Sequence, residues 1–92
     1  MNEITRGEEA SYLMKHEIIR EAFDKTREGI VNAMQDSPMG DEKTHNRLVI
    51  AMQLLNHIER HIKTIAETGK LAAIQFAKDE GVIKRGFRKV VG

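Results

Sequence analysis

The stretch of sequence that decides the fold is residues 48–65, LVIAMQLLNHIERHIKTI. Its apolar residues alternate steps of three and four over about five turns, which is the spacing of one face of an α-helix. They are Leu48, Ala51, Met52, Leu55, Ile58, Ile62 and Ile65. The same spacing matches the a and d positions of a coiled coil. The stretch therefore predicts an amphipathic helix that packs against another helix.

Two further apolar residues, Ile50 and Leu54, lie beside this stripe. They widen it beyond what a single partner helix covers. We therefore expect a contact in addition to the one made within the chain. The predicted protein interface consists of Ile50, Leu54, Leu55 and Ile62.

A second apolar stripe lies upstream, at intervals of three, four or seven residues, so a second amphipathic helix is expected there. Its members are Tyr12, Ile19, Phe23, Ile30 and Met34. Thr5 and Glu8 have the spacing of a capping box, which predicts that this helix starts near Thr5. We expect one continuous helix from there to about residue 34.

Residues 36–41, DSPMGD, separate the two stripes and contain the only proline, Pro38. Proline disfavours helix in the residue before it, and Gly40 tolerates a wide range of backbone conformations. A loop is therefore expected here, with Asp41 or Thr44 capping the next helix. The predicted fold class is all-α, an antiparallel helical hairpin.

The region after residue 65 is less clearly patterned. Gly69 is either the end of the helix or a residue that the helix runs through, and the sequence alone leaves both possibilities open. Residues 71–77 are helical in either case, as a short third helix or a helix extension, and Gly81 is the predicted stop. The predicted organisation is a helical hairpin domain at residues 1–80 and an extended, basic C-terminal arm at residues 81–92.

Charge divides the chain in the same way. The net charge is +1, but residues 81–92 contain four basic residues and no acidic one, so residues 1–80 carry a net charge of −3. Basic side chains contact phosphates or acidic protein surfaces, and an aromatic ring stacks on a base. The predicted binding residues in the arm are Lys84, Arg85, Phe87, Arg88 and Lys89, with a simple solvated tail as the alternative.

The sequence contains little that supports catalysis. There is no cysteine, and no phosphate-binding glycine loop, nucleophile elbow or dinucleotide fingerprint occurs. His57 and His61 lie one helical turn apart, but the zinc-protease pattern places glutamate directly after the first histidine, and here Glu59 comes two residues later. We therefore expect no enzymatic activity, no cofactor and no metal site.

The chain has 92 residues, so it forms one domain at most, near the lower size limit for independent folding. The N-terminus lacks the apolar run of a signal peptide, and no segment approaches the ~20 apolar residues needed to span a bilayer. We expect a protein that is neither secreted by a signal peptide nor inserted in a membrane, and whose stability depends on a partner.

Several short motifs carry a resemblance. They are Arg6-Gly7-Glu8-Glu9-Ala10, Glu21-Ala22-Phe23-Asp24 followed by Arg27-Glu28, Arg60-His61-Ile62, and residues 65–72, IAETGKLA. Over about residues 6–72 the chain resembles small uncharacterised α-helical proteins of tailed bacteriophages, of the head-morphogenesis and DNA-packaging type. The resemblance implies a location in the host cytoplasm or the virion, and it implies no site residue.

Together these observations predict a non-enzymatic phage structural or assembly protein that self-associates or docks on a larger protein through an apolar helix face. One alternative is a nucleic-acid-binding accessory protein that uses the basic arm. Another is a small phage inhibitor that occupies a groove of a host enzyme with its exposed helix face. A homo-oligomer or a protein partner is expected in the first case, and nucleic acid in the second.

Overall fold

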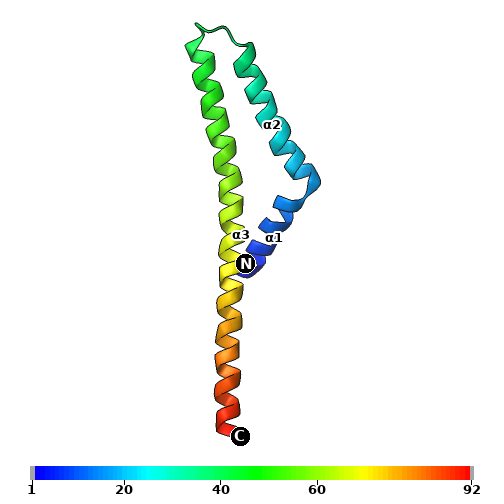
Figure 1. Cartoon of the computed structure of the whole chain (residues 1–92), viewed down its shortest axis with the longest axis vertical. Coiled ribbons are helices and arrows are strands. Elements are labelled where there is room, and N and C mark those ends of the chain that lie inside the picture. The colour runs from blue at the N-terminus through cyan, green and yellow to red at the C-terminus, as the bar shows by residue number, and fades with distance from the viewer. Residues whose placement is uncertain (1, 92) are drawn as a thin grey trace.

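The computed structural model describes the backbone of residues 2–91 and the side chains of residues 2–80, as three helices (Figure 1). These are α1 (Glu3–Lys15), α2 (Glu17–Asp36) and α3 (Glu42–Val91). No strand occurs within residues 2–91. The predicted all-α fold class is confirmed.

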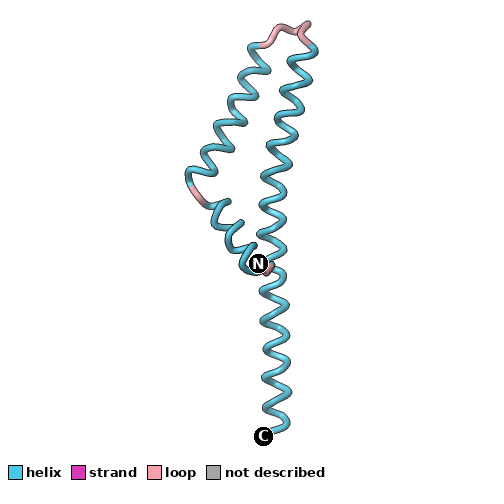
Figure 2. Tube along the Cα trace, turned by 180° about the vertical axis from the view of Figure 1, so that it is seen from behind, coloured by secondary structure: helices cyan, strands magenta, loops and turns pink. Residues whose placement is uncertain are grey.

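The long helix α3 sets the shape of the molecule, which measures 78 × 24 × 19 Å. At 1.5 Å per residue, its 50 residues account for about 75 Å of the longest dimension. From the loop at one end, α2 and then α1 run back alongside α3 in the opposite direction, and the N-terminus lies beside the middle of α3 (Figure 1, Figure 2). The C-terminal half of α3 extends beyond them with no other described helix beside it.

The single helix expected from about residue 5 to 34 is instead two helices that meet at His16. His16 has ψ 123°, outside the helical range, and the bend at this point is visible in Figure 2. Its ring accepts a hydrogen bond at Nδ1 from the Ile18 N–H (3.2 Å), so it caps the start of α2. The Tyr12 ring lies edge-on to it at 5.6 Å. Histidine is an uncommon cap, which is why the sequence pattern did not predict the break.

The first helix also begins earlier than predicted. Asn2 is the N-cap, and its Oδ1 accepts a hydrogen bond from the Thr5 N–H at 2.8 Å. Thr5 already lies within α1, so the predicted capping box is wrong. Asparagine is among the best N-caps because its side-chain oxygen satisfies a free N–H of the first turn.

The loop between α2 and α3 matches its prediction. Ser37 ends α2, with its Oγ donating to the Ala33 carbonyl at 2.7 Å. Asp41 caps α3, and its Oδ1 accepts from the Thr44 N–H at 3.1 Å. Hydrogen bonds from the Thr44 side chain and from its backbone N–H stabilise the carboxylate and lower the pKa of Asp41 below its usual value.

Gly69 does not end a helix, because α3 runs through it. It is buried where α1 crosses α3, directly against Gly7. A Cβ atom on either glycine would lie 2.5 Å from the Cα atom of the other, closer than atoms approach without overlap. The two glycines therefore allow a close backbone contact between α1 and α3 that no larger residue permits.

The prediction of a helix stop at Gly81 and an extended arm after it is also wrong, because α3 is helical to Val91. Lys84, Arg85, Phe87, Arg88 and Lys89 are therefore on a helical backbone. Their side chains lie outside the described residues.

The interior of this fold is small. Among residues 2–80 the buried apolar side chains are Ala10 and Ala66, and both belong to the α1–α3 crossing. No large side chain in this part of the chain is fully buried. Close packing is thus confined to one point, where small residues let two helices meet.

Candidate protein interface

One face of α3 is covered by the rest of the chain. Leu48, Leu55 and Ile62 are half-buried on this face, and Ala66 and Gly69 are buried on it. Leu55 and Ile62 were predicted to form an intermolecular interface. Both side chains are less exposed than those of Ile50 and Leu54, the other two residues of the predicted interface.

A charged cluster joins α2 to α3 on the same side. Arg27 of α2 donates from Nη2 to Glu59 Oε2 of α3 at 2.6 Å and to Asn56 Oδ1 at 3.2 Å. Lys63 pairs with the other oxygen of Glu59 at 3.3 Å. The hydrogen bond from Arg27 lowers the pKa of Glu59, since it favours the ionised carboxylate. This cluster fixes how α2 lies against α3 where apolar packing is sparse.

A second face of α3 is uncovered. Ile50, Leu54 and Ile58 follow one another at four-residue steps and are 54%, 58% and 52% exposed. Residues four apart are neighbours on a helix surface, so the three form one continuous apolar row. We call them the lateral stripe. Ile50 and Leu54 are two of the four residues predicted to form the protein interface.

Ile58 is more exposed than its spacing in the sequence predicts. Its spacing placed it on the packed stripe, yet the structure exposes it. The relevant pattern was its position four residues after Leu54, in the same row.

The C-terminal part of α3 carries more uncovered apolar side chains. Leu71, Ile74 and Phe76 are all more than half exposed. The total accessible area of the chain is 7610 Å². A compact monomer of 10.5 kDa exposes about 5,400 Å². The fold thus leaves roughly 2,200 Å² more surface in water than a globular chain of this mass.

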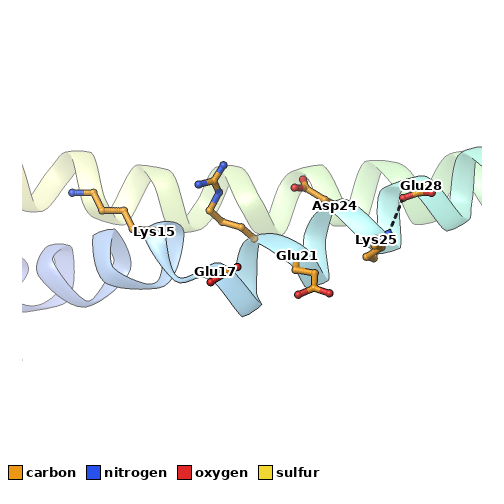
Figure 3. A pocket seen from close by; sticks show the side chains of 7 residues that line it. Lys15, Glu17, Glu21, Asp24, Lys25 and Glu28 are labelled. Atoms are coloured by element: carbon orange, nitrogen blue, oxygen red, sulfur yellow. Dashed lines mark ion pairs between the residues drawn. The ribbon is translucent and has the colours of Figure 1, made fainter.

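One hollow on the surface is not a ligand pocket. It lies at the bend between α1 and α2 and encloses about 710 Å³. All seven residues that line it are charged, and Lys25 pairs with Glu28 at 3.6 Å within it (Figure 3). Pockets for small molecules are mostly apolar with a few polar groups. This hollow is instead a hydrated, charged surface of α2.

Within residues 2–80, no group of three or more histidine, cysteine or acidic side chains is arranged to hold a metal ion. His57 and His61 are both exposed on α3. No helix in the described part of the chain combines the length and apolar character needed to cross a membrane.

Comparison with protein-family models, with curated proteins and with solved structures gives no match for this chain. The geometry itself therefore carries the functional argument. It offers extended apolar helix faces, and these define a candidate protein interface.

Proposed function

We propose that this protein is a non-enzymatic structural or assembly protein that self-associates through the apolar faces of its long helix. The observation that carries the proposal is the lateral stripe. Its three side chains, Ile50, Leu54 and Ile58, are apolar and lie in one row on α3, yet each is more than half exposed to solvent. Contiguous exposed apolar surface in a small protein marks an interaction site. The resemblance to small helical phage proteins makes a phage particle, or its assembly in the host cytoplasm, the proposed setting.

The energetics support association. The area in excess of a compact monomer, roughly 2,200 Å², is larger than the ~800 Å² that one partner contributes to a standard interface. Covering even part of it stabilises the fold, because apolar burial contributes about 25 cal/mol per Å². A chain with so few buried side chains depends on such a contribution.

The test is a comparison of two variants by light scattering after size exclusion. Leu54→Glu places a charge in the middle of the lateral stripe, whereas Gln53→Glu places the same charge on the neighbouring exposed residue. We expect a wild-type mass above 10.5 kDa, a lower mass for Leu54→Glu and an unchanged mass for Gln53→Glu. A wild-type chain that remains a monomer at all concentrations overturns the proposal.

The same experiment examines the nucleic-acid alternative if absorbance at 260 and 280 nm is recorded across the peak. Binding through the basic residues at 84–89 predicts nucleic acid in the peak at low salt and its loss at high salt, because phosphate contacts weaken steeply with salt. Under our proposal the oligomer is free of nucleic acid and resists salt.

A further inference from the structure

The bend between α1 and α2 is held by one side chain. His16 ends α1, where its backbone N–H donates to the Leu13 carbonyl at 3.2 Å. It also begins α2, where its ring accepts at Nδ1 from the Ile18 N–H at 3.2 Å. A neutral ring that accepts at Nδ1 carries its proton on Nε2. The capped bend therefore requires a free lone pair on Nδ1.

A protonated imidazole does not make this hydrogen bond. Both ring nitrogens of the cation carry a hydrogen, so neither of them accepts. The Ile18 N–H then loses its partner and α2 loses its N-cap. The helix dipoles oppose each other at His16, because the C-terminal end of α1 attracts a positive ring and the N-terminal end of α2 repels it. The lost cap is therefore the main effect of protonation, and it destabilises the bent form.

A straight alternative to the bend exists in the same sequence. The apolar stripe of residues 12–34 has the spacing of one continuous helix that runs through residue 16. In such a helix the first N–H groups of α2 bond to the last carbonyls of α1, so no side-chain cap is needed. Tyr12 and His16 remain neighbours in it, since they are four residues apart. Loss of the cap therefore favours the straight form over the bent one.

The contact that opposes straightening is small. The bend turns α1 toward α3 (Figure 2), and the two helices cross at Gly7 and Gly69. The apolar side chains buried at the crossing are those of Ala10 and Ala66. Because two alanine side chains bury little apolar area, this contact contributes little to the stability of the bent form. The loss of one hydrogen bond is then sufficient to change the populations of the two forms.

We propose that protonation of His16 releases α1 from α3 by removing the cap that holds the bend. Histidine is the side chain that ordinarily changes its charge between pH 5 and 8. The bent form requires the neutral ring, so it is favoured above this range and loses population as the pH falls through it. Release uncovers α3 at Ala66 and Gly69. The device does not rest on the proposed self-association, and it determines how much of α3 is free for contacts.

Ionisable side chains from all three helices lie around the junction. Those that line the adjoining hollows nearest the bend are Tyr12 and Lys15 of α1, Glu17 and Arg20 of α2, and Glu59, Lys63 and Lys70 of α3. Carboxylate, lysine, arginine and tyrosine side chains ordinarily keep their charge between pH 5 and 8. His61 also lies near α1, because it lines a hollow together with Glu3 and Arg6. A test must therefore separate His16 from His61.

The first test measures the separation of α1 and α3 with spin labels. The chain has no cysteine, so Glu8→Cys with Lys70→Cys places two labels at the hollow beside the crossing. Dilution with unlabelled chain restricts the measurement to distances within one chain. We expect a short distance at about pH 7.5 and an additional, longer one at about pH 5.5. An N-cap changes an equilibrium about fivefold, so the ratio of released to docked chains should rise about fivefold. An unchanged distribution overturns the proposal.

Variants of His16 identify the group that responds to pH. His16→Asn keeps a side-chain acceptor that does not titrate, and asparagine is a strong N-cap, so α1 should stay docked at both pH values. His16→Ala has no acceptor, so α1 should be released equally at both. If His16→Asn responds to pH as the wild type does, the proposal fails. His61→Gln should keep the wild-type response, and loss of the response in this variant equally overturns the proposal.

The second test examines the straight form. Glu8→Cys with Lys25→Cys places one label on α1 and one on α2, on either side of the bend. In a continuous helix these positions are about 26 Å apart along the axis, further than across a bend. We expect this distance to lengthen as the pH falls, together with the release of α1. A constant distance overturns straightening as the cause of release. A chain that is monomeric throughout defeats the proposed function and leaves this inference standing.

Discussion

The contact between Gly7 and Gly69 gives the sharpest prediction about the fold. Alanine forms helix better than glycine by about 1 kcal/mol, so a glycine-to-alanine change within a helix is stabilising wherever the new methyl group has room. Gly29 in α2 has that room, since nothing lies within 4 Å of where its Cβ would be. Gly7 does not, because its Cβ would lie 2.5 Å from Gly69 Cα.

The magnitudes follow from these distances. Ordinary contact begins near 3.4 Å, so Gly7→Ala separates the two helices by about 1 Å and exposes Ala10 and Ala66, the buried apolar side chains of the crossing. Overpacking of this kind costs about 1–3 kcal/mol, which exceeds the gain in helix propensity. We expect Gly29→Ala to stabilise by about 1 kcal/mol and Gly7→Ala to destabilise by about 1 kcal/mol.

The assay is thermal unfolding followed by circular dichroism, at one fixed protein concentration because association shifts the midpoint. A difference of about 2 kcal/mol between the variants corresponds to roughly 8–16 °C in Tm for a chain of this size. Amide hydrogen exchange should show the loss of protection mainly in α1. If Gly7→Ala is as stable as Gly29→Ala, the close crossing of α1 and α3 is wrong.

The remaining predictions concern the polar groups at the helix ends and between the helices. Asn2→Ala removes the N-cap of α1 and should lower the free energy of unfolding, measured in urea, by about 1 kcal/mol. Thr5→Ala should lower it much less. If Thr5→Ala had the larger effect, Thr5 rather than Asn2 would be the N-cap. Because the pKa of Glu59 is lowered in the folded chain, its stabilisation is present above pH ~4.5 and is lost as pH falls through the folded pKa. Glu59→Gln should therefore flatten the acid side of the stability curve, by less than ~1 kcal/mol because Arg27 is 34% exposed. An identical acid slope in wild type and variant would contradict that role.

The sequence predicted the fold class and the loop well because both depend on local chemistry. The two apolar stripes have helical spacing, and the residues at 36–41 are strong turn formers. Asp41 caps α3 by a local hydrogen bond to Thr44, which needs no information about the rest of the fold. Such features are determined within a few residues of chain.

The features that the sequence did not settle depend on contacts between distant residues. Gly69 resembles a helix end when its neighbours in sequence are considered, but its role is to admit Gly7, which lies 62 positions earlier. Gly7 and Gly69 lie in the stretches 6–10 and 65–72, so these two stretches of sequence meet at this crossing. The bend at His16 also depends on a contact between distant parts of the chain, because it directs α1 onto α3 while α2 lies further from α3.

In the candidate interface, too, some features follow from local sequence spacing and others depend on where α1 and α2 lie. Sequence spacing identified Ile50 and Leu54 as surplus apolar residues, and they are exposed. It also placed Leu55 and Ile62 in the interface, and these two side chains are half-buried. Adjacent rows on one helix differ by small angles, so only the position of α1 and α2 decides which row is covered.

The measurement that tests the central claim most directly is the light-scattering mass of the wild-type chain across a hundredfold range of concentration, at low and high salt. Association through apolar helix faces predicts a mass approaching or exceeding twice 10.5 kDa that resists salt and carries no nucleic acid. A mass of 10.5 kDa under every condition would contradict it.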